Sequence, residues 1–299
     1  MEIIEKIKKL QKEKNAVILA HNYQMPEIQD IADYVGDSLE LSIQASRTDA
    51  DVIVFCGVYF MAETAKILSP QKRVLLPDKE AGCPMADMIN ADQLRALKAA
   101  HPRAKVLCYV NTSAEVKAEC NLCCTSSNAV RIAREAFLPH EEVIFAPDKY
   151  LAHYVSVQAG REFIVWKGFC PTHARILPEA VLEQKGLHPA ARVMVHPECR
   201  PEVIALADRV LSTSGMIKYA GEDRAEEFIV CTEIGILHRL KKENPAKTFY
   251  KVDVAVCPNM KRTTLEKVLW SLEEMHFEID VPPEIIARAG GSIRKMLDF

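Results

Sequence analysis

Three Cys-Pro dipeptides recur at a constant interval along the chain: Cys83-Pro84, Cys170-Pro171 and Cys257-Pro258. Each cysteine follows the previous one by 87 residues, which is the trace that a threefold internal repeat leaves in a sequence. If the repeats pack around a pseudo-threefold axis, three thiolates meet and form a metal or cluster site with one open coordination position. The alternative is that each cysteine is a small buried apolar residue. The shared proline favours the metal site.

Polar residues follow the first apolar run of each repeat at matched positions. The three pairs are His21 and Tyr23, Tyr109 and Asn111, and His196 and Glu198, spaced 88 and 87 residues apart. Residues two positions apart in an extended chain face the same side, so all six can face one cleft. A single His or Tyr at a strand end is more often structural than catalytic. Six matched positions favour a role in binding or catalysis.

Hydroxyl residues form a third matched set: Ser38, Ser126 and Thr213, spaced 88 and 87 residues apart. Each precedes an expected helix, and a single Ser or Thr at that place is expected to be a helix N-cap. Three helix N-termini directed at one centre would instead bind an anion through N–H groups and hydroxyls. The implied ligand carries carboxylates or a phosphate.

Two other groups have open interpretations. Cys120-x-x-Cys123-Cys124 resembles a redox dithiol or part of a metal site, but it occurs in one repeat only and is expected to be incidental. His173 lies three residues after Cys170 and could line the cleft or orient a cluster ligand, while a place in an ordinary loop is equally expected. The sequence contains no glycine-rich phosphate-binding loop and no G-x-G-x-x-G.

Hydrophobic periodicity predicts the elements that must position these residues. The first repeat is expected to contain helices at 1–15, 26–35, 39–46 and 61–68 and strands at 17–20, 52–55 and 73–76. The second has helices at 91–100, 128–137 and 149–158 and strands at 106–108, 143–145 and 162–165. The third has helices at 178–185, 201–210 and 233–241 and strands at 192–195, 227–230 and 248–252, before a last helix at 265–274.

This alternation predicts an α/β protein with parallel sheets. We expect three homologous three-layer αβα domains with short parallel sheets, related by pseudo-threefold symmetry around a central active site. The expected bounds are 1–87, 88–174 and 175–299, the last including a C-terminal helical tail. Ligands of parallel sheets bind beyond the carboxyl ends of the strands, which places all three matched sets in one cleft.

Composition limits the class of protein. A chain of 299 residues, 49% of them hydrophobic, suits two or three domains with sizeable cores. The 38 Lys and Arg against 41 Asp and Glu give a net charge of −3, which supports neither nucleic acid nor a membrane surface as partner. Ten cysteines without an apolar signal core indicate reduced thiols and predict a cytoplasmic location.

Together these residues resemble the quinolinate synthase family of bacterial and archaeal NAD biosynthesis, from the N-terminal helix to 260–266. The resemblance rests on the segments 21–24, 36–38, 109–111, 124–128 and 196–199 and on the three Cys-Pro sites. It implies a condensing and dehydrating transferase that converts iminoaspartate (iminosuccinate) and dihydroxyacetone phosphate into quinolinate, phosphate and water. It also implies one [4Fe-4S] cluster per chain held by Cys83, Cys170 and Cys257, and functional coupling to an L-aspartate oxidase or dehydrogenase.

The implied reaction has no net redox change, so the open iron of the cluster is expected to act as a Lewis acid. Glu198 is the expected base and Tyr23 its acid/base partner, while His196 and His21 orient or donate. Tyr109 and Asn111 are expected to hold carboxyl or carbonyl oxygens. The hydroxyls of Ser38, Ser126 and Thr213 are expected to bind the anionic end of a substrate.

Two other functions stay open at the level of sequence. One is an iron–sulfur hydro-lyase that acts on another hydroxyacid, which would share the cluster but would not need a phosphate pocket. The other is a non-catalytic iron–sulfur or zinc protein, in which a structural site would normally have four protein ligands.

Overall fold

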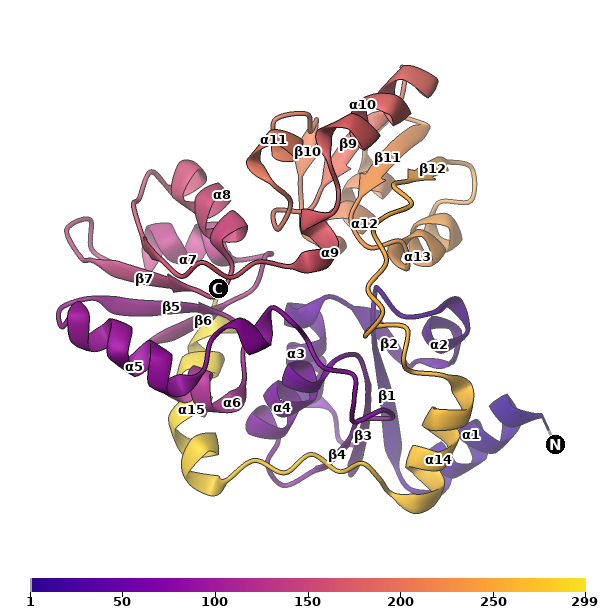
Figure 1. The fold of residues 1–299 in the computed structure, drawn as a ribbon. Coiled ribbons are helices and arrows are strands. Elements are labelled where there is room, and N and C mark those ends of the chain that lie inside the picture. The colour runs from indigo at the N-terminus through magenta and orange to yellow at the C-terminus, as the bar shows by residue number, and fades with distance from the viewer. Residues whose placement is uncertain (1) are drawn as a thin grey trace.

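The computed structural model describes residues 2–299 and contains three four-stranded sheets in which every pair of strands is parallel. The strand orders are β2-β1-β3-β4, β6-β5-β7-β8 and β10-β9-β11-β12, so each sheet has the same topology. Figure 1 shows the sheets as three lobes around a common centre. The expected fold class is confirmed, while the domain bounds at 87 and 174 stay a prediction.

The first sheet contains β1 (Ala16–His21), β2 (Tyr34–Gly36), β3 (Val52–Cys56) and β4 (Arg73–Leu75). Its helices are α1 (Ile3–Glu13), α2 (Pro26–Ile31), α3 (Ser38–Arg47) and α4 (Tyr59–Leu68), followed by a 3-10 turn at Ala86–Met88. Met1, which the expected N-terminal helix included, lies outside the described residues. The strands β1 and β3 are continuous apolar runs because both faces of a parallel sheet are covered by helices.

The second sheet contains β5 (Lys105–Tyr109), β6 (Leu122–Cys124), β7 (Val143–Ala146) and β8 (Ile164–Val165). Its segment also forms α5 (Ala91–Ala100), α6 (Ala114–Ala118), α7 (Ala129–Glu135), α8 (Lys149–Ala159) and α9 (Pro171–Ala174). The third sheet contains β9 (Arg192–Val195), β10 (Arg209–Val210), β11 (Glu227–Cys231) and β12 (Thr248–Lys251). Its helices are α10 (Pro178–Leu187), α11 (Pro201–Ile204), α12 (Thr213–Glu222) and α13 (Ile236–Glu243).

Two expected helices were too long, because each hides a short edge strand. The helix expected at 26–35 ends at Ile31 and the chain continues into β2, while the helix expected at 201–210 ends at Ile204 before β10. An acidic side chain fixes each edge strand to the sheet: Asp33 accepts the Ile18 N–H at 2.8 Å, and Asp208 accepts the Val193 N–H at 2.8 Å.

The second repeat uses an amide for the same purpose, since Asn121 accepts the Val106 N–H at 2.8 Å beside β6. These bonds hold the edge strands against the sheet, where pairing outweighs the helical spacing of the apolar residues.

The C-terminal segment lies against the first two sheets. Helix α14 (Leu265–Glu274) packs on α1, and α15 (Pro283–Met296) packs on α4, α6 and β6. The Ser292 hydroxyl donates to the Lys117 carbonyl at 3.1 Å, and Arg288 pairs with Glu119. The tail therefore joins the first sheet to the second at the periphery (Figure 1).

Strand alternation divides the core into layers. Val17 and Leu19 of β1 belong to the largest buried cluster, while Ile18 and Ala20 face a second cluster beneath α1 and α14. The largest cluster also includes Met194 of β9, so all three sheets contribute to it. Packing on both faces holds the strand ends in place around the centre. Within residues 2–299, no helix combines the length and the apolar character needed to cross a membrane.

Candidate active site

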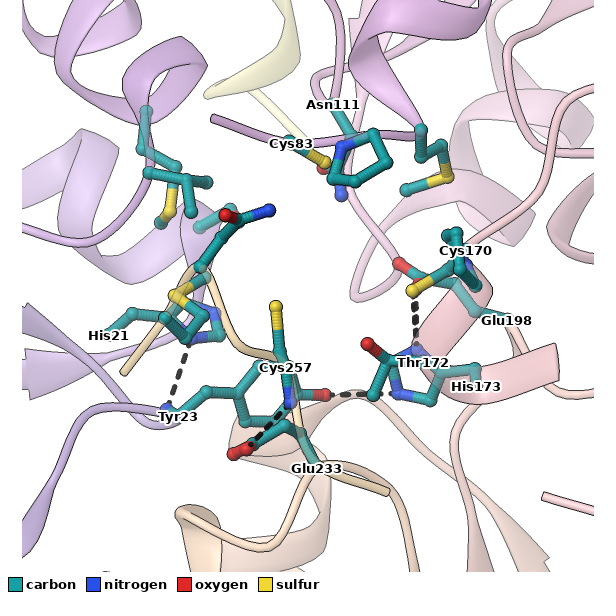
Figure 2. A pocket seen from close by; sticks show the side chains of 18 of the residues that line it. His21, Tyr23, Cys83, Asn111, Cys170, Thr172, His173, Glu198, Glu233 and Cys257 are labelled. Atoms are coloured by element: carbon teal, nitrogen blue, oxygen red, sulfur yellow. Dashed lines mark hydrogen bonds and ion pairs between the residues drawn. The ribbon is translucent and has the colours of Figure 1, made fainter. Parts of the chain in front are cut away.

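One cavity lies where the three repeats meet, and it encloses about 1010 Å³ of space not filled by protein atoms, part of it open to solvent. The structure brings all twelve sequence-predicted site residues to its wall: His21, Tyr23, Ser38, Cys83, Tyr109, Asn111, Ser126, Cys170, His196, Glu198, Thr213 and Cys257. Figure 2 shows side chains from separate repeats pointing into the same space. The repeat thus locates the site, while the role of each residue stays a prediction.

The three Cys-Pro cysteines differ from most other cysteines of the chain. Cys83, Cys170 and Cys257 are half-buried, and Figure 2 shows their sulfur atoms facing the same central space. Six others, by contrast, are fully buried in the core: Cys56, Cys108, Cys123, Cys124, Cys199 and Cys231. Their place on the cavity wall favours the metal site over the alternative of three small core residues, and the ligand set stays a prediction.

Burial raises the pKa of each of the three thiols, and backbone N–H groups of the turn that follows act against it. The donors are Met85 and Ala86 for Cys83, His173 for Cys170, and Asn259 and Met260 for Cys257. The net pKa of Cys83 is about 12, because burial, which raises the pKa, outweighs these N–H groups, which lower it. N–H donors around a sulfur stabilise its thiolate and tune a bound metal. The three turns therefore have the donor set for a metal with three thiolate ligands.

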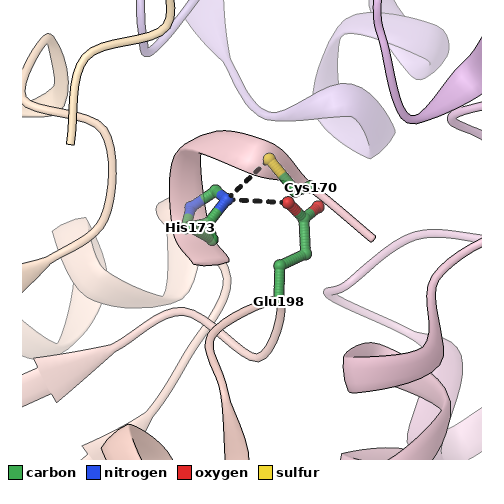
Figure 3. A group of neighbouring side chains, drawn as sticks. All are labelled: Cys170, His173 and Glu198. Carbon is green, nitrogen blue, oxygen red and sulfur yellow. Dashed lines mark hydrogen bonds and ion pairs between the residues drawn. The ribbon is translucent and has the colours of Figure 1, made fainter. Parts of the chain in front are cut away.

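A second group of potential ligands overlaps this set. One ligand atom each of Cys170, His173 and Glu198 lies within 4.8 Å of the others, which makes them a candidate metal-binding group (Figure 3). The His173 Nδ1 atom lies 2.8 Å from a Glu198 oxygen and 3.2 Å from the Cys170 sulfur. Of the two interpretations of His173, the structure bears out the place in the cleft.

Glu198 is a buried carboxyl group surrounded by hydrogen-bond donors. The Tyr109 hydroxyl donates to its Oε1 atom, and His173 contacts its Oε2 atom. Burial raises the pKa of Glu198, but His173, His196 and the Tyr109 hydroxyl outweigh burial and hold the pKa below its ordinary value. Glu198 is therefore an ionised acceptor at neutral pH.

A continuous hydrogen-bond chain joins Glu198 to Tyr23. His173 lies between them, with its Nδ1 atom at Glu198 and its Nε2 atom 2.8 Å from the Thr232 hydroxyl. The Thr232 hydroxyl in turn lies 2.5 Å from the Tyr23 hydroxyl. Burial and the charge of Glu198 raise the pKa of Tyr23 well above its ordinary value, so this phenol keeps its proton. The chain can move a proton between the two residues.

His21 and His196 occupy equivalent places and have equivalent bonds. The Nδ1 atom of His21 accepts the Tyr23 N–H at 3.2 Å, and that of His196 accepts the Glu198 N–H at 3.4 Å. Burial lowers the pKa of His21 to about 4 and that of His196 to about 3. Both rings are thus neutral at pH 7, with the proton on Nε2. They can donate hydrogen bonds to a ligand.

The matched hydroxyls are not helix N-caps, contrary to the default expectation. Asp37 caps α3 and Ser212 caps α12, one position before Ser38 and Thr213, while α7 begins after Asn128. The Ser127 hydroxyl contacts both Asp37 and Ser212, so the caps form one polar cluster. Neighbouring side chains cap α3 and α12, the N-cap residue of α7 makes no side-chain cap bond, and Ser38, Ser126 and Thr213 lie on the cavity wall.

Two of these polar groups have unused hydrogen-bonding capacity. The Asn22 amide donates to the Thr213 hydroxyl at 2.9 Å, which leaves the hydroxyl proton free to donate to an anion. The buried Oδ1 atom of Asn111 has no hydrogen-bond partner among the described residues. A buried polar atom without a partner costs about 1–3 kcal/mol, so Asn111 suits a ligand that supplies one.

Sequence reasoning missed Thr232 and Glu233, which follow β11. Thr232 joins His173 to Tyr23, and Glu233 accepts the Cys257 N–H at 3.2 Å and pairs with Lys261 at 2.9 Å. Both lie at the carboxyl end of a central strand, as the matched sets do. Applying the strand-end rule to the third strand of each repeat, and not only to the first, would have identified them.

Comparison with known proteins gives a consistent result over nearly the whole chain. The family model described as quinolinate synthetase A protein matches residues 5–298. A relative from Dehalococcoides mccartyi, named quinolinate synthase, is 56% identical over 296 residues, which cover 99% of this chain and 97% of the relative. Quinolinate synthase 1 of Methanosarcina acetivorans is 53% identical over 297 residues, covering 99% of this chain and 97% of that protein.

Proposed function

This chain belongs to the quinolinate synthetase A family, whose members are enzymes of NAD biosynthesis, and on that premise we propose the reaction that it catalyses. The chain condenses iminoaspartate with dihydroxyacetone phosphate and releases quinolinate, phosphate and water. Formation of the pyridine ring requires condensation, proton transfers and loss of water, with no net oxidation or reduction. The supply of iminoaspartate would come from an L-aspartate oxidase or dehydrogenase acting in the same cytoplasm.

One observation supports this proposal above the others. A single cavity combines three half-buried thiols, a buried carboxylate with neutral imidazoles and phenols, and three hydroxyls beside helix starts. The reaction needs each of these three kinds of group: a metal to assist dehydration, proton carriers for the ring-forming steps, and donors for phosphate and carboxylates. A structural or oxygen-sensing metal site would need only the first.

Cys83, Cys170 and Cys257 would hold a [4Fe-4S] cluster. Their chemistry fits it, because backbone N–H groups of each turn favour the thiolate form and each thiol lies on the wall of the same cavity. When bound, such a cluster with three protein ligands supplies a Lewis-acidic iron that assists loss of a hydroxyl as water. Glu198 and His173 would then stay free for proton transfer instead of serving as ligands.

Proton transfer is assigned to the two ends of the hydrogen-bond chain. Ionised Glu198 is the acceptor, and protonated Tyr23 is the donor. His173 and Thr232 connect them, with contacts of 2.8 Å on both sides of the imidazole. A proton taken up by Glu198 can therefore return to Tyr23, which resets both groups after each cycle.

The remaining wall is assigned to binding. Neutral His21 and His196 donate to carbonyl or carboxylate oxygens of the substrate, as does the Asn111 amide nitrogen, while the unpartnered Asn111 Oδ1 atom accepts a hydrogen bond. Tyr109 is assigned to the same oxygens, for which its hydroxyl exchanges Glu198 for the substrate. The hydroxyls of Ser38, Ser126 and Thr213 bind the phosphate or a carboxylate, aided by the starts of α3 and α12. These donors hold the two reactants in one orientation, which is a large part of the catalytic effect for a condensation.

A substrate-dependence assay separates this reaction from its alternatives. The anaerobically purified protein should consume dihydroxyacetone phosphate only when iminoaspartate is also present, and quinolinate should form in equal amount. A hydro-lyase would instead dehydrate a hydroxyacid without dihydroxyacetone phosphate. A non-catalytic protein would consume neither substrate. Either of these last results would overturn the proposed function.

A further inference from the structure

A buried ion pair joins Glu233, on the cavity wall, to Lys261, and neither residue has been assigned a role so far. Glu233 is fully buried, and its carboxylate lies 2.9 Å from the ammonium group of Lys261, whose side chain is 18% exposed. Figure 2 shows Glu233 beside Cys257 on the side of the cavity that faces Tyr23. Removing two charges from water costs several kcal/mol, so a buried ion pair is weak evidence for a stabilising role. Another role, such as fixing the position of its neighbours, is therefore considered.

The carboxylate end of the pair holds the Cys257 turn. One Glu233 oxygen accepts the Cys257 N–H at 3.2 Å, and the other accepts the Gly235 N–H at 2.7 Å. Lys261 lies four residues after Cys257 in the same turn, and its side chain returns to the carboxylate that Cys257 also contacts. The turn that carries the thiol is thus fixed at both ends by one buried side chain.

The ammonium end of the pair holds the loop that carries Tyr23. Lys261 donates to the Tyr23 carbonyl at 2.5 Å, and Gln29 contacts the Gly235 carbonyl at 2.9 Å from the same side. A Cβ atom at Gly235 would lie 2.6 Å from the Tyr23 carbonyl oxygen and 2.7 Å from the Lys261 ammonium group. The loop can approach this closely only because residue 235 has no side chain.

From these contacts we propose that Glu233 and Lys261 form a positioning pair that fixes the Cys257 turn relative to Tyr23. The pair connects the first repeat, which supplies Tyr23, with the third, which supplies Cys257. Because Thr232 precedes Glu233, these two residues also hold both ends of Tyr23: Thr232 contacts the hydroxyl, and Glu233 holds the carbonyl through Lys261. The proposal rests on the proposed function, in which Cys257 holds the metal and Tyr23 carries a proton.

The pair exists in one repeat only. The positions that correspond to Lys261 in the other two Cys-Pro turns are Asp87 and Ala174, neither of which is cationic. Cys83 and Cys257 therefore form a matched comparison within one chain: both are half-buried thiols in N–H-lined turns, and only Cys257 is held by the ion pair.

Thiol reactivity tests the pair without any substrate. The full-length chain, stripped of metal with a chelator, is treated with iodoacetamide, and the alkylation rates of Cys257 and Cys83 are compared by mass spectrometry. Lys261→Met and Glu233→Gln should each raise the Cys257 rate about tenfold relative to Cys83, the change expected from losing one such buried hydrogen bond. The double variant should add little to the singles, because the two residues act as one unit.

An unchanged ratio of the two rates in both single variants would overturn the proposal. If one variant fails to fold, the other decides. Because the ratio needs neither cluster nor turnover, it is independent of whether the proposed reaction is correct. In the cluster-loaded enzyme, Lys261→Met should lower kcat about tenfold through misplaced Tyr23, with a smaller change in KM. A change confined to KM would contradict the link to Tyr23.

Discussion

Two buried glutamates at the cavity have contrasting surroundings. Both line the open space, and Glu198 contacts the Tyr109 hydroxyl and His173, which continues the hydrogen-bond chain to Thr232. Glu233 contacts the Lys261 ammonium group and the backbone N–H groups of Gly235 and Cys257. Both side chains are nearly inaccessible, at 4% and 0% exposure, so burial does not distinguish them.

The comparison teaches that the partners of a buried carboxylate indicate its role. Partners that continue a hydrogen-bond chain allow a proton to pass, so the Glu198 region can do chemistry. An ammonium group and backbone N–H groups fix a position, so the Glu233 region can hold the Cys257 turn in place. Four predictions follow, from the largest expected effect to the smallest. The first concerns the metal proposed to lie between the Glu198 and Glu233 regions.

Replacing any one of Cys83, Cys170 or Cys257 by Ser should remove most of the iron, expected at about four atoms per chain, and abolish turnover. The loss follows because the proposed cluster has only these three thiolate ligands, and a serine hydroxyl is a poor replacement for one of them. Iron analysis and absorption spectra of anaerobic protein give the measurement. Cys231→Ser is the matched control and should keep its iron, since Cys231 is fully buried away from the cavity. Equal iron loss in Cys231→Ser and in the three Cys-Pro variants would contradict the assignment of the metal ligands.

Tyr23→Phe should lower kcat by at least about 10²-fold while the cluster stays intact, as expected for loss of a proton donor. Its hydroxyl is the end of the chain from Glu198, and its raised pKa keeps the proton in place. Steady-state kinetics with an iron assay give the measurement. Tyr34→Phe, at an exposed position in β2, should behave like the natural protein. Near-normal turnover of Tyr23→Phe would place the donor elsewhere.

Ser126→Ala should raise KM for dihydroxyacetone phosphate about tenfold with little change in kcat, because one hydrogen bond to a charged ligand is lost. This result would assign substrate binding to the matched hydroxyls, a third region of the cavity that is separate from Glu198 and Glu233. The exposed Ser46→Ala is the control, since its hydroxyl only contacts the Ile43 carbonyl. An effect on kcat alone would move Ser126 from binding to proton transfer.

The smallest effect concerns a carboxylate outside the cavity. Burial raises the pKa of Glu119, but Arg95, Arg288 and Lys98 outweigh burial and lower the pKa to about 2. Because the folded pKa lies below the unfolded one, the stabilisation is present above about pH 4.5 and is lost as pH falls towards 2. Glu119→Gln should therefore cost about 1 kcal/mol at pH 7, and the difference should vanish in acid. A difference that persists at pH 2 in denaturant titrations would contradict this assignment.

The sequence predicted which residues line the cavity more accurately than it predicted the helices and strands around them. The interval of 87 residues brought three sets of matched residues to one cavity, because equivalent positions of repeated parallel sheets meet at their strand ends. The edge strands β2 and β10 were mistaken for helix ends, since strands of two or three residues have no periodicity of their own.

The remaining misses have a different physical cause. Asp37 and Ser212 lie one position from the matched hydroxyls, and only the backbone conformation shows which residue caps the helix. Glu233 and Lys261 occur in one repeat, so no periodic signal marks them. The contact of Lys261 with Tyr23 joins residues more than two hundred positions apart, which a single sequence does not indicate.

The most direct test of the division between the two regions compares Glu198→Gln with Glu233→Gln in one preparation. Each variant is loaded with iron and sulfide, and kcat and the rate of iron release to a chelator are measured together. Glu198→Gln should lose at least about 10²-fold in kcat with unchanged iron release. Glu233→Gln should release iron about tenfold faster and lose much less in kcat. Near-normal turnover of Glu198→Gln, or the same losses in both variants, would contradict the division.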